Sequence, residues 1–140
     1  MPTVPLTVVF VDDDPDMVEL VRISVGSEPD FELVATTGEA SAVLDLVRKH
    51  HPDIVILDHR LDDPSSPDEP ARCRGVRAHQ SGLELVEGTR VAVPDATIAI
   101  FSGRSGLSDA ARNVGADLHV QKPGPMRTLW SSIREARAVR

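Results

Sequence analysis

Two apolar runs that each end in carboxylates constrain the fold of this chain most strongly. Residues 54–57 read Ile-Val-Ile-Leu and lead directly into Asp58, and the largely apolar residues 6–11 lead into three consecutive aspartates at 12–14. An apolar run without polar alternation is typical of a strand buried on both faces of a parallel sheet, although so short a run also fits a buried helix segment. In open α/β sheets, reactive groups gather beyond the carboxyl ends of the strands. The two runs therefore place candidate reactive carboxylates at that edge of a sheet.

The composition excludes several classes of protein. The chain has 140 residues, 41% of them hydrophobic, which is enough for one domain with a buried core. A net charge of -7 and a pI near 5.1 argue against direct nucleic-acid binding, which depends on clustered Lys and Arg. The single cysteine, Cys73, cannot form an internal disulfide, and no apolar run approaches the roughly 20 residues that span a bilayer. We therefore expect a single soluble domain in the cytoplasm, without membrane contact.

Signals for helices alternate with signals for strands along the rest of the chain. Asp14 followed by Pro15 predicts an N-cap and a first helical residue, and Gly26 marks the end of that helix. Further strands are expected at residues 31–35, 52–58, 96–101 and 118–121, and further helices at residues 38–50, 83–88, 107–114 and 126–139. This alternation predicts an α/β fold in which helices cover both faces of a parallel sheet through right-handed crossovers.

Residues 62–80 interrupt the alternation and are expected to form a loop. The segment holds three prolines and almost no large apolar side chain. It is much longer than the roughly 2–6 residues usual between a strand and a helix in α/β units. Its first half is acidic and its second half is basic, a polarity that fits either a solvated insertion or a surface for a partner.

The expected strand ends bring several polar side chains to one edge of the sheet. They are Asp12, Asp13, Asp58, Ser102 and Lys122. Carboxylates held close together repel one another, and a bound cation relieves that repulsion. Mg²⁺ suits such a site because it prefers oxygen ligands from one or two carboxylates, water and a phosphoryl group. A lysine and a hydroxyl nearby would stabilise charge on a phosphoryl group, so the pattern indicates phosphoryl transfer to a carboxylate nucleophile.

Four motifs in this order and spacing carry a family resemblance. They are Val9-Phe10-Val11-Asp12-Asp13-Asp14-Pro15, Pro52-Asp53-Ile54-Val55-Ile56-Leu57-Asp58, Ile100-Phe101-Ser102-Gly103, and Gly115-Ala116-Asp117 followed by Lys122-Pro123. The chain resembles the receiver domain of bacterial two-component response regulators, the CheY-like superfamily, over nearly its whole length apart from residues 62–80. The resemblance implies a flavodoxin-like doubly wound sheet of five parallel strands, (βα)5, with an extended loop after the third strand. We expect residues 1–140 to form one receiver domain, with no output domain in this chain and the continuation of the native protein past Arg140 left open.

The resemblance implies a metal site built around the acidic residues. Asp13 would coordinate Mg²⁺ directly and Asp12 mostly through water, with Mn²⁺ as an alternative ion. Asp58 and the backbone carbonyl of Arg60 would complete the protein ligands.

The resemblance also implies a phosphoacceptor role for Asp58. This residue would take the phosphoryl group from the phosphohistidine of a sensor histidine kinase or a phosphotransfer protein. Ser102 would move toward the phosphoryl group, Lys122 would bind its oxygens, and Pro123 would follow a cis peptide bond. The chain would be a signalling domain rather than a turnover enzyme, and its conformational switch would act on an output domain or partner protein. Homodimerisation stays open.

The chain departs from the family pattern at several positions. His119 stands where the family usually has Tyr or Phe, and either a packing role or a switching role fits it. Ser81-Gly82 replaces the commoner Asp-Gly, and the loop at residues 62–80 is an insertion. His50 and His51 fit the end of a helix better than a metal site. Zinc ligation by Cys73, His79 and His59 matches no standard spacing and supplies only three ligands.

Two other function classes stay open. One is a pseudo-receiver that keeps the fold as a protein-interaction module and does not cycle phosphate; its usual sign is the loss of an acidic residue or the lysine, and none is lost here. The other is a phosphatase with an aspartate nucleophile at the end of the first strand, which Asp12 and Asp14 fit formally as Asp-x-Asp. Catalytic turnover would distinguish such a phosphatase from a receiver, which is labelled once per chain.

Overall fold

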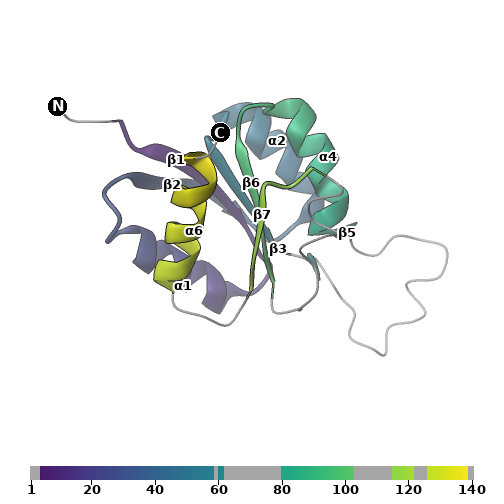
Figure 1. Ribbon diagram of the computed structural model, residues 1–140. Coiled ribbons are helices and arrows are strands. Elements are labelled where there is room, and N and C mark those ends of the chain that lie inside the picture. The colour runs from purple at the N-terminus through teal and green to yellow at the C-terminus, as the bar shows by residue number, and fades with distance from the viewer. Residues whose placement is uncertain (1–3, 59, 62–79, 103–114, 122–125, 139–140) are drawn as a thin grey trace.

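The computed structural model describes residues 4–58, 60–61, 80–102, 115–121 and 126–138, with side chains described except at residues 40, 60–61, 80–84 and 102. One five-stranded parallel sheet organises them, in the order β2-β1-β3-β6-β7 (Figure 1). Its strands are β1 (Leu6–Val11), β2 (Phe31–Thr37), β3 (Ile54–Asp58), β6 (Thr97–Ser102) and β7 (Leu118–Gln121). The described helices are α1 (Pro15–Val25), α2 (Ala40–His50), α4 (Gly82–Ala92) and α6 (Met126–Ala138). The predicted α/β class, parallel sheet and doubly wound strand order are confirmed.

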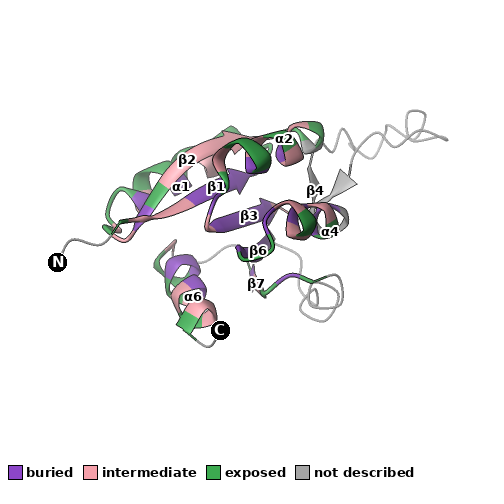
Figure 2. Cartoon of the chain, turned by 90° about the horizontal axis from the view of Figure 1, so that it is seen from above, coloured by how far each residue is buried: buried purple, intermediate pink, exposed green. Residues whose placement is uncertain are grey.

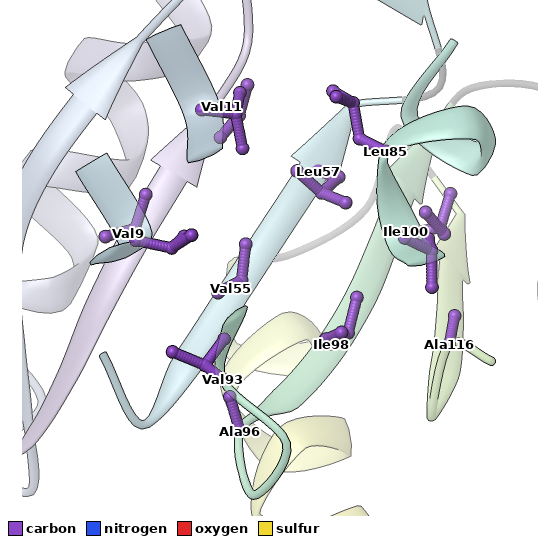
Figure 3. Packing of buried hydrophobic residues seen from close by; sticks show 13 residues of the cluster. Val9, Val11, Val55, Leu57, Leu85, Val93, Ala96, Ile98, Ile100 and Ala116 are labelled. Atoms are coloured by element: carbon purple, nitrogen blue, oxygen red, sulfur yellow. The ribbon is translucent and has the colours of Figure 1, made fainter. Parts of the chain in front are cut away.

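The central strands are buried on both faces, which explains their apolar sequences. The side chains of β1, β3 and β6 alternate between two core clusters, because successive residues of a strand point to opposite faces. Val9, Val55 and Ile98 lie side by side in one cluster, as the strand register requires (Figure 3). In the view of Figure 2, β1 and β3 are buried along most of their length. The buried residues of these three strands are therefore apolar except Thr97, which begins β6.

The helices cover the two faces in pairs. α2 and α4 pack on one face of the sheet, and α1 and α6 pack on the other (Figure 1). Gly88 allows the first pair to approach closely, because a Cβ there would lie 3.2 Å from a methyl carbon of Leu44. In the second pair, Trp130 is fully buried and its indole N–H donates to Ser24 Oγ at 2.9 Å. Each face of the sheet is thus covered by a helix pair that packs on an apolar core cluster.

Most helix ends follow the signals in the sequence. The side chain of Asp14 caps α1 by accepting from the Asp16 amide at 3.0 Å, with Pro15 as the first helical residue. α2 ends at His50, and His51 is its C-cap with a left-handed backbone at φ 45°. The prediction that the two histidines form a helix end is confirmed. Strand β2 runs two residues beyond the predicted end at residue 35, α2 begins at Ala40 rather than 38, and α4 extends to Ala92 rather than 88.

The end of the expected loop at residues 62–80 differs from the prediction. Strand β4 (Arg60–Leu61) pairs antiparallel with β5 (Gln80–Ser81), so Gln80 belongs to a short β-ladder rather than to the loop. Two-residue strands carry no alternation that a sequence could reveal. The remainder of the loop and the helix expected at residues 107–114 lie outside the described residues. Among the described helices, none combines the length and apolar character needed to cross a membrane.

Candidate functional site

Three carboxylates converge at the carboxyl edge of the sheet. Asp12, Asp13 and Asp58 each offer a carboxylate oxygen, and these oxygens all lie within 4.8 Å of one another. The strand register explains the convergence, because Val11 of β1 pairs with Leu57 of β3. An aspartate follows each of these two residues in the sequence. The three side chains differ in solvent exposure: Asp12 is buried and 2% exposed, Asp58 is partly exposed, and Asp13 is exposed. We call these three residues the acidic cluster.

The turn between β1 and α1 fixes Asp12. Its side-chain Oδ1 accepts from the Asp14 amide at 2.9 Å, and its own backbone amide donates to the Thr37 carbonyl at 3.0 Å. The carboxylate of Asp14 instead caps α1, because it accepts a hydrogen bond from the Asp16 amide in the first turn of that helix. The two neighbouring aspartates thus take different roles because one belongs to the strand end and the other to the helix start.

A shallow pocket opens beside the acidic cluster. It is lined by Asp12, Asp13, Pro15, Val18, Glu19, Gly38 and Glu39. The pocket lies between the start of α1 and the turn from β2 to α2, at the edge of the sheet where ligands bind in doubly wound folds. An ion or small phosphorylated group near the cluster would therefore reach it from solvent.

The donor set of the acidic cluster fits a hard divalent cation. Mg²⁺ is held in proteins by one or two carboxylates with water and phosphate oxygens, and the cluster supplies carboxylate oxygens at one point. A nitrogen- or sulfur-preferring metal would find no imidazole or thiolate among the three side chains. Asp12, Asp13 and Asp58 are thus a candidate Mg²⁺ site.

The other predicted site residues are described to different extents. Ser102 ends β6, and its neighbour Phe101 pairs with Asp58, so the backbone of Ser102 lies at the same edge as the acidic cluster. Arg60 lies in β4, two residues past Asp58. Lys122 and Pro123 lie outside the described residues, as do Cys73, His79 and His59 of the zinc alternative.

His119 lies on β7 opposite Ile100 of β6 and is partly buried. Burial lowers the pKa of its imidazole below the ordinary histidine value, because the charged form is poorly solvated there. The neutral imidazole is therefore favoured, which fits a packing role.

Sequence reasoning missed the turn from β2 to α2. Gly38 was expected to begin the helix, but it lies in this turn, where a Cβ would meet the backbone of Asp13 at 2.9 Å. A glycine just before a helix is a common signal, so nothing in the sequence marked it as a neighbour of the acidic cluster. The strand pairing between β1 and β2 brings the two together.

Comparisons with known proteins find similarity to response regulators. No family model matches the chain. A curated relative, the DNA-binding response regulator MtrA of Mycolicibacterium smegmatis, is 32% identical over 135 residues, covering 96% of this chain and 51% of the relative. The probable transcriptional regulatory protein TcrX of Mycobacterium tuberculosis is 27% identical over 132 residues, covering 93% of this chain and 49% of the relative. The chain thus spans about half the length of these curated relatives.

A solved structure extends the likeness to three dimensions. A two-component response regulator of the LuxR family from Aurantimonas sp. SI85-9A1 superposes with a TM-score of 0.79 at 26% identity. The match covers 98% of this chain and 88% of the other chain. The similarity therefore extends over the sheet, the helices and both ends of the described fold.

Proposed function

We propose that this chain, a CheY-like response regulator receiver domain, accepts a phosphoryl group on Asp58. The observation that carries the proposal is the convergence of Asp12, Asp13 and Asp58 at the carboxyl edge of the sheet. Asp58 is partly exposed at the end of β3, so a phosphodonor can reach its carboxylate. The donor would be a sensor histidine kinase or a phosphotransfer protein.

The transfer exchanges one bond to phosphorus for another. A carboxylate oxygen of Asp58 forms the new P–O bond while the P–N bond of the donor phosphohistidine breaks. The electron pair of the broken bond stays on the imidazole nitrogen, which takes up a proton from solvent. Each chain gains one phosphoryl group, so the chain catalyses its own modification and is not a turnover enzyme. Hydrolysis of the aspartyl phosphate by water would return Asp58 to its carboxylate form.

The acidic cluster would hold Mg²⁺, or Mn²⁺, beside the phosphoacceptor. Asp13 would be a direct ligand and Asp12 mostly a water-mediated one, with Asp58 and the carbonyl of Arg60 completing the set. The ion would neutralise charge on the phosphoryl oxygens during transfer. The hydrogen bond from the Asp14 amide to Asp12 Oδ1 supports this assignment, because it holds the Asp12 carboxylate in place before an ion binds.

Two further residues would act on the phosphoryl group itself. Ser102 would donate its hydroxyl hydrogen to a phosphoryl oxygen, and Lys122 would place its positive charge on another. Ser102 ends β6 and Lys122 follows β7 in the sequence, and both strands lie on the same side of β3 in the sheet order, which supports these roles.

Phosphorylation would shift an equilibrium between two conformations of the domain. The movement of Ser102 toward the phosphoryl group would repack the face that includes β7 and α6. That face would then act on an output domain or a partner protein. We place this activity in the cytoplasm and assign no direct nucleic-acid contact to this chain, whose net charge is -7.

Labelling with a small acyl phosphate tests the proposal. Incubation with acetyl phosphate and Mg²⁺ should add one phosphoryl group per chain, measured by intact mass. Asp58→Asn should abolish the mass gain because the nucleophilic oxygen is lost. Asp95→Asn, at an exposed aspartate before β6, is the matched control and should label like the wild type. Labelling that persists in Asp58→Asn would overturn the assignment.

A further inference from the structure

The turn between β2 and α2 packs against the backbone of the acidic cluster. This turn, residues 37–39, joins the end of β2 to the start of α2 and lines the pocket beside Asp13. β2 is the neighbour of β1 in the sheet, and Val11 pairs with Thr37 at the last position of both strands. The two turns that follow these strands therefore leave the sheet side by side.

Gly38 lies at the point of closest approach. A Cβ at this position would be 2.9 Å from the Cα of Asp13, 3.2 Å from the carbonyl oxygen of Asp12 and 3.3 Å from the Cβ of Asp13. Real Cβ atoms are essentially never found closer than 3.0 Å to another heavy atom. The two nearest atoms belong to backbone and the third is a Cβ bonded directly to it, so none can rotate aside as the end of a long side chain can. Any side chain at residue 38 would therefore displace Asp13.

The need for glycine at this position comes from contact rather than from backbone conformation. Among the described residues, the glycine with a positive φ is Gly115, at 103°, and Gly38 is not in that region. An alanine at this position would therefore avoid the strain of a left-handed backbone. The cost that the structure shows for a substitution is the collision with Asp12 and Asp13.

Hydrogen bonds hold the turn itself in place. The Thr37 carbonyl accepts from the Asp12 amide at 3.0 Å, and the Thr37 hydroxyl oxygen accepts from the Glu39 amide at 3.1 Å. The first bond ties the turn to the acidic cluster, and the second fixes the backbone on either side of Gly38. The turn is thus held at both ends while its middle touches Asp13.

We infer that Gly38 is a positioning residue for the acidic cluster, and that the turn at residues 37–39 sets where the Asp13 carboxylate meets a divalent cation. This inference rests on the proposed Mg²⁺ site. Gly38 contributes no ligand atom; its missing side chain lets Asp13 occupy the place that the cation requires. Metal affinity is sensitive to such support, since changes in residues behind the ligands weaken binding by about 10-fold or more.

Calorimetric titration with MgCl₂ tests the inference on the wild type, Gly38→Ala and a matched control. The control is Gly88→Ala, whose new Cβ meets the flexible end of Leu44 between α2 and α4. We expect Gly88→Ala to bind Mg²⁺ with the wild-type Kd and Gly38→Ala to bind about 10-fold more weakly or worse. Circular dichroism and thermal unfolding in EDTA establish that each variant is folded.

A second readout separates displacement of Asp13 from general damage. Labelling of Asp58 by acetyl phosphate in Gly38→Ala should be slow at wild-type Mg²⁺ concentrations and should recover when Mg²⁺ is raised in proportion to the new Kd. Labelling that stays slow at saturating Mg²⁺ would indicate general damage and overturn the positioning role. Wild-type affinity in Gly38→Ala would also overturn it, while leaving Asp58 labelling and the proposed function intact.

Thr37→Val carries the test if Gly38→Ala does not fold. This variant removes the hydroxyl acceptor of the Glu39 amide without adding bulk, so the turn loosens beside Asp13. We expect Mg²⁺ binding to weaken measurably, by less than in Gly38→Ala, and unchanged affinity would overturn the inference. If the wild type itself binds no Mg²⁺, the metal site of the proposed function fails and the positioning role fails with it.

Discussion

His119 shows how one partly buried side chain links protonation to stability. It lies on β7, and burial holds the pKa of its imidazole below the ordinary histidine value. The unfolded chain therefore takes up a proton at a higher pH than the native protein does. By linkage, the stability associated with the neutral imidazole is fully present above the unfolded pKa of about 6.5 and is lost as the pH falls through that value.

Replacing His119 by Phe should remove this pH dependence. Phe is one of the residues usual at this position in the family, and it does not titrate. The free energy of unfolding of His119→Phe, relative to the wild type, should rise as the pH is lowered from about 7.5 to about 5.5. Urea titrations followed by the fluorescence of Trp130, the single tryptophan, measure the difference. A difference that stays constant across this range would show that His119 titrates alike in the native and unfolded chains.

The carboxylates of the site could be predicted from the sequence, but their support could not. Asp12 and Asp58 follow apolar runs that predict strands. Because parallel strands end at the same edge of a sheet, these two residues could be predicted to lie close together. The contact between Gly38 and Asp13 depends on the exact path of two turns, which no periodic pattern encodes. A glycine before a helix has many explanations, and only the folded backbone selects one.

At the scale of elements, Arg134 joins α6 to the turn before β2, which is the strand at the other edge of the sheet from β7. Two guanidinium nitrogens of Arg134 donate hydrogen bonds: Nε and Nη2 donate to the two carboxylate oxygens of Asp30 at 2.7 Å each, and Nη2 also donates to Glu28. The guanidinium carbon lies 4.9 Å from the ring centre of Phe31, which itself packs on Trp130. The hydrogen bonds from Arg134 lower the pKa of Asp30. Arg134 thus fastens α6 to the turn that precedes β2.

Replacing Arg134 by Met should loosen this attachment. We expect a loss of about 1 kcal/mol in the free energy of unfolding, since the arginine is 39% exposed and solvent screens its ion pairs. Arg134→Lys should lose a smaller part, because lysine keeps the charge without the planar fork. Arg127→Met, at an exposed arginine of the same helix, controls for the lost charge and should leave the urea midpoint almost unchanged. Equal midpoints for Arg134→Met and Arg127→Met would contradict the role of this cluster.

The main strands could be predicted better than the short connections between them. β1 and β7 have the predicted bounds, and the others differ by a few residues, because burial on two faces leaves a plain apolar signal. The β4–β5 ladder could not be predicted, since its pairing depends on bringing residues 60 and 81 together across a long segment. Pairing between strand residues so distant in sequence depends on the overall fold rather than on local sequence preference.

At the scale of the whole molecule, the two ends of the parallel strands differ in their charges. The starts of the strands form the amino edge of the sheet, and their ends form the carboxyl edge. Three arginines tie elements together at the amino edge: Arg90 donates to Asp117 at 2.7 Å, Arg134 to Asp30 at 2.7 Å, and Arg137 to the Asp53 carbonyl at 3.1 Å and to Thr97 at 3.0 Å. The carboxyl edge instead gathers the three carboxylates of the acidic cluster. The amino edge therefore stabilises the fold, and the carboxyl edge holds repelling charges that a cation can relieve.

This asymmetry predicts that Mg²⁺ stabilises the protein through the carboxyl edge alone. At tenfold excess over its Kd, an ion that binds only the native state adds about 1.4 kcal/mol to the free energy of unfolding. Asp13→Ala should remove this gain, because the proposed direct ligand is lost. Asp95→Ala, at an exposed carboxylate of the amino edge, should keep it in full. Urea midpoints with and without Mg²⁺ measure the gain in each variant. An undiminished gain in Asp13→Ala would rule out Asp13 as a direct ligand, and a lost gain in Asp95→Ala would show that Mg²⁺ acts through general screening rather than at the acidic cluster.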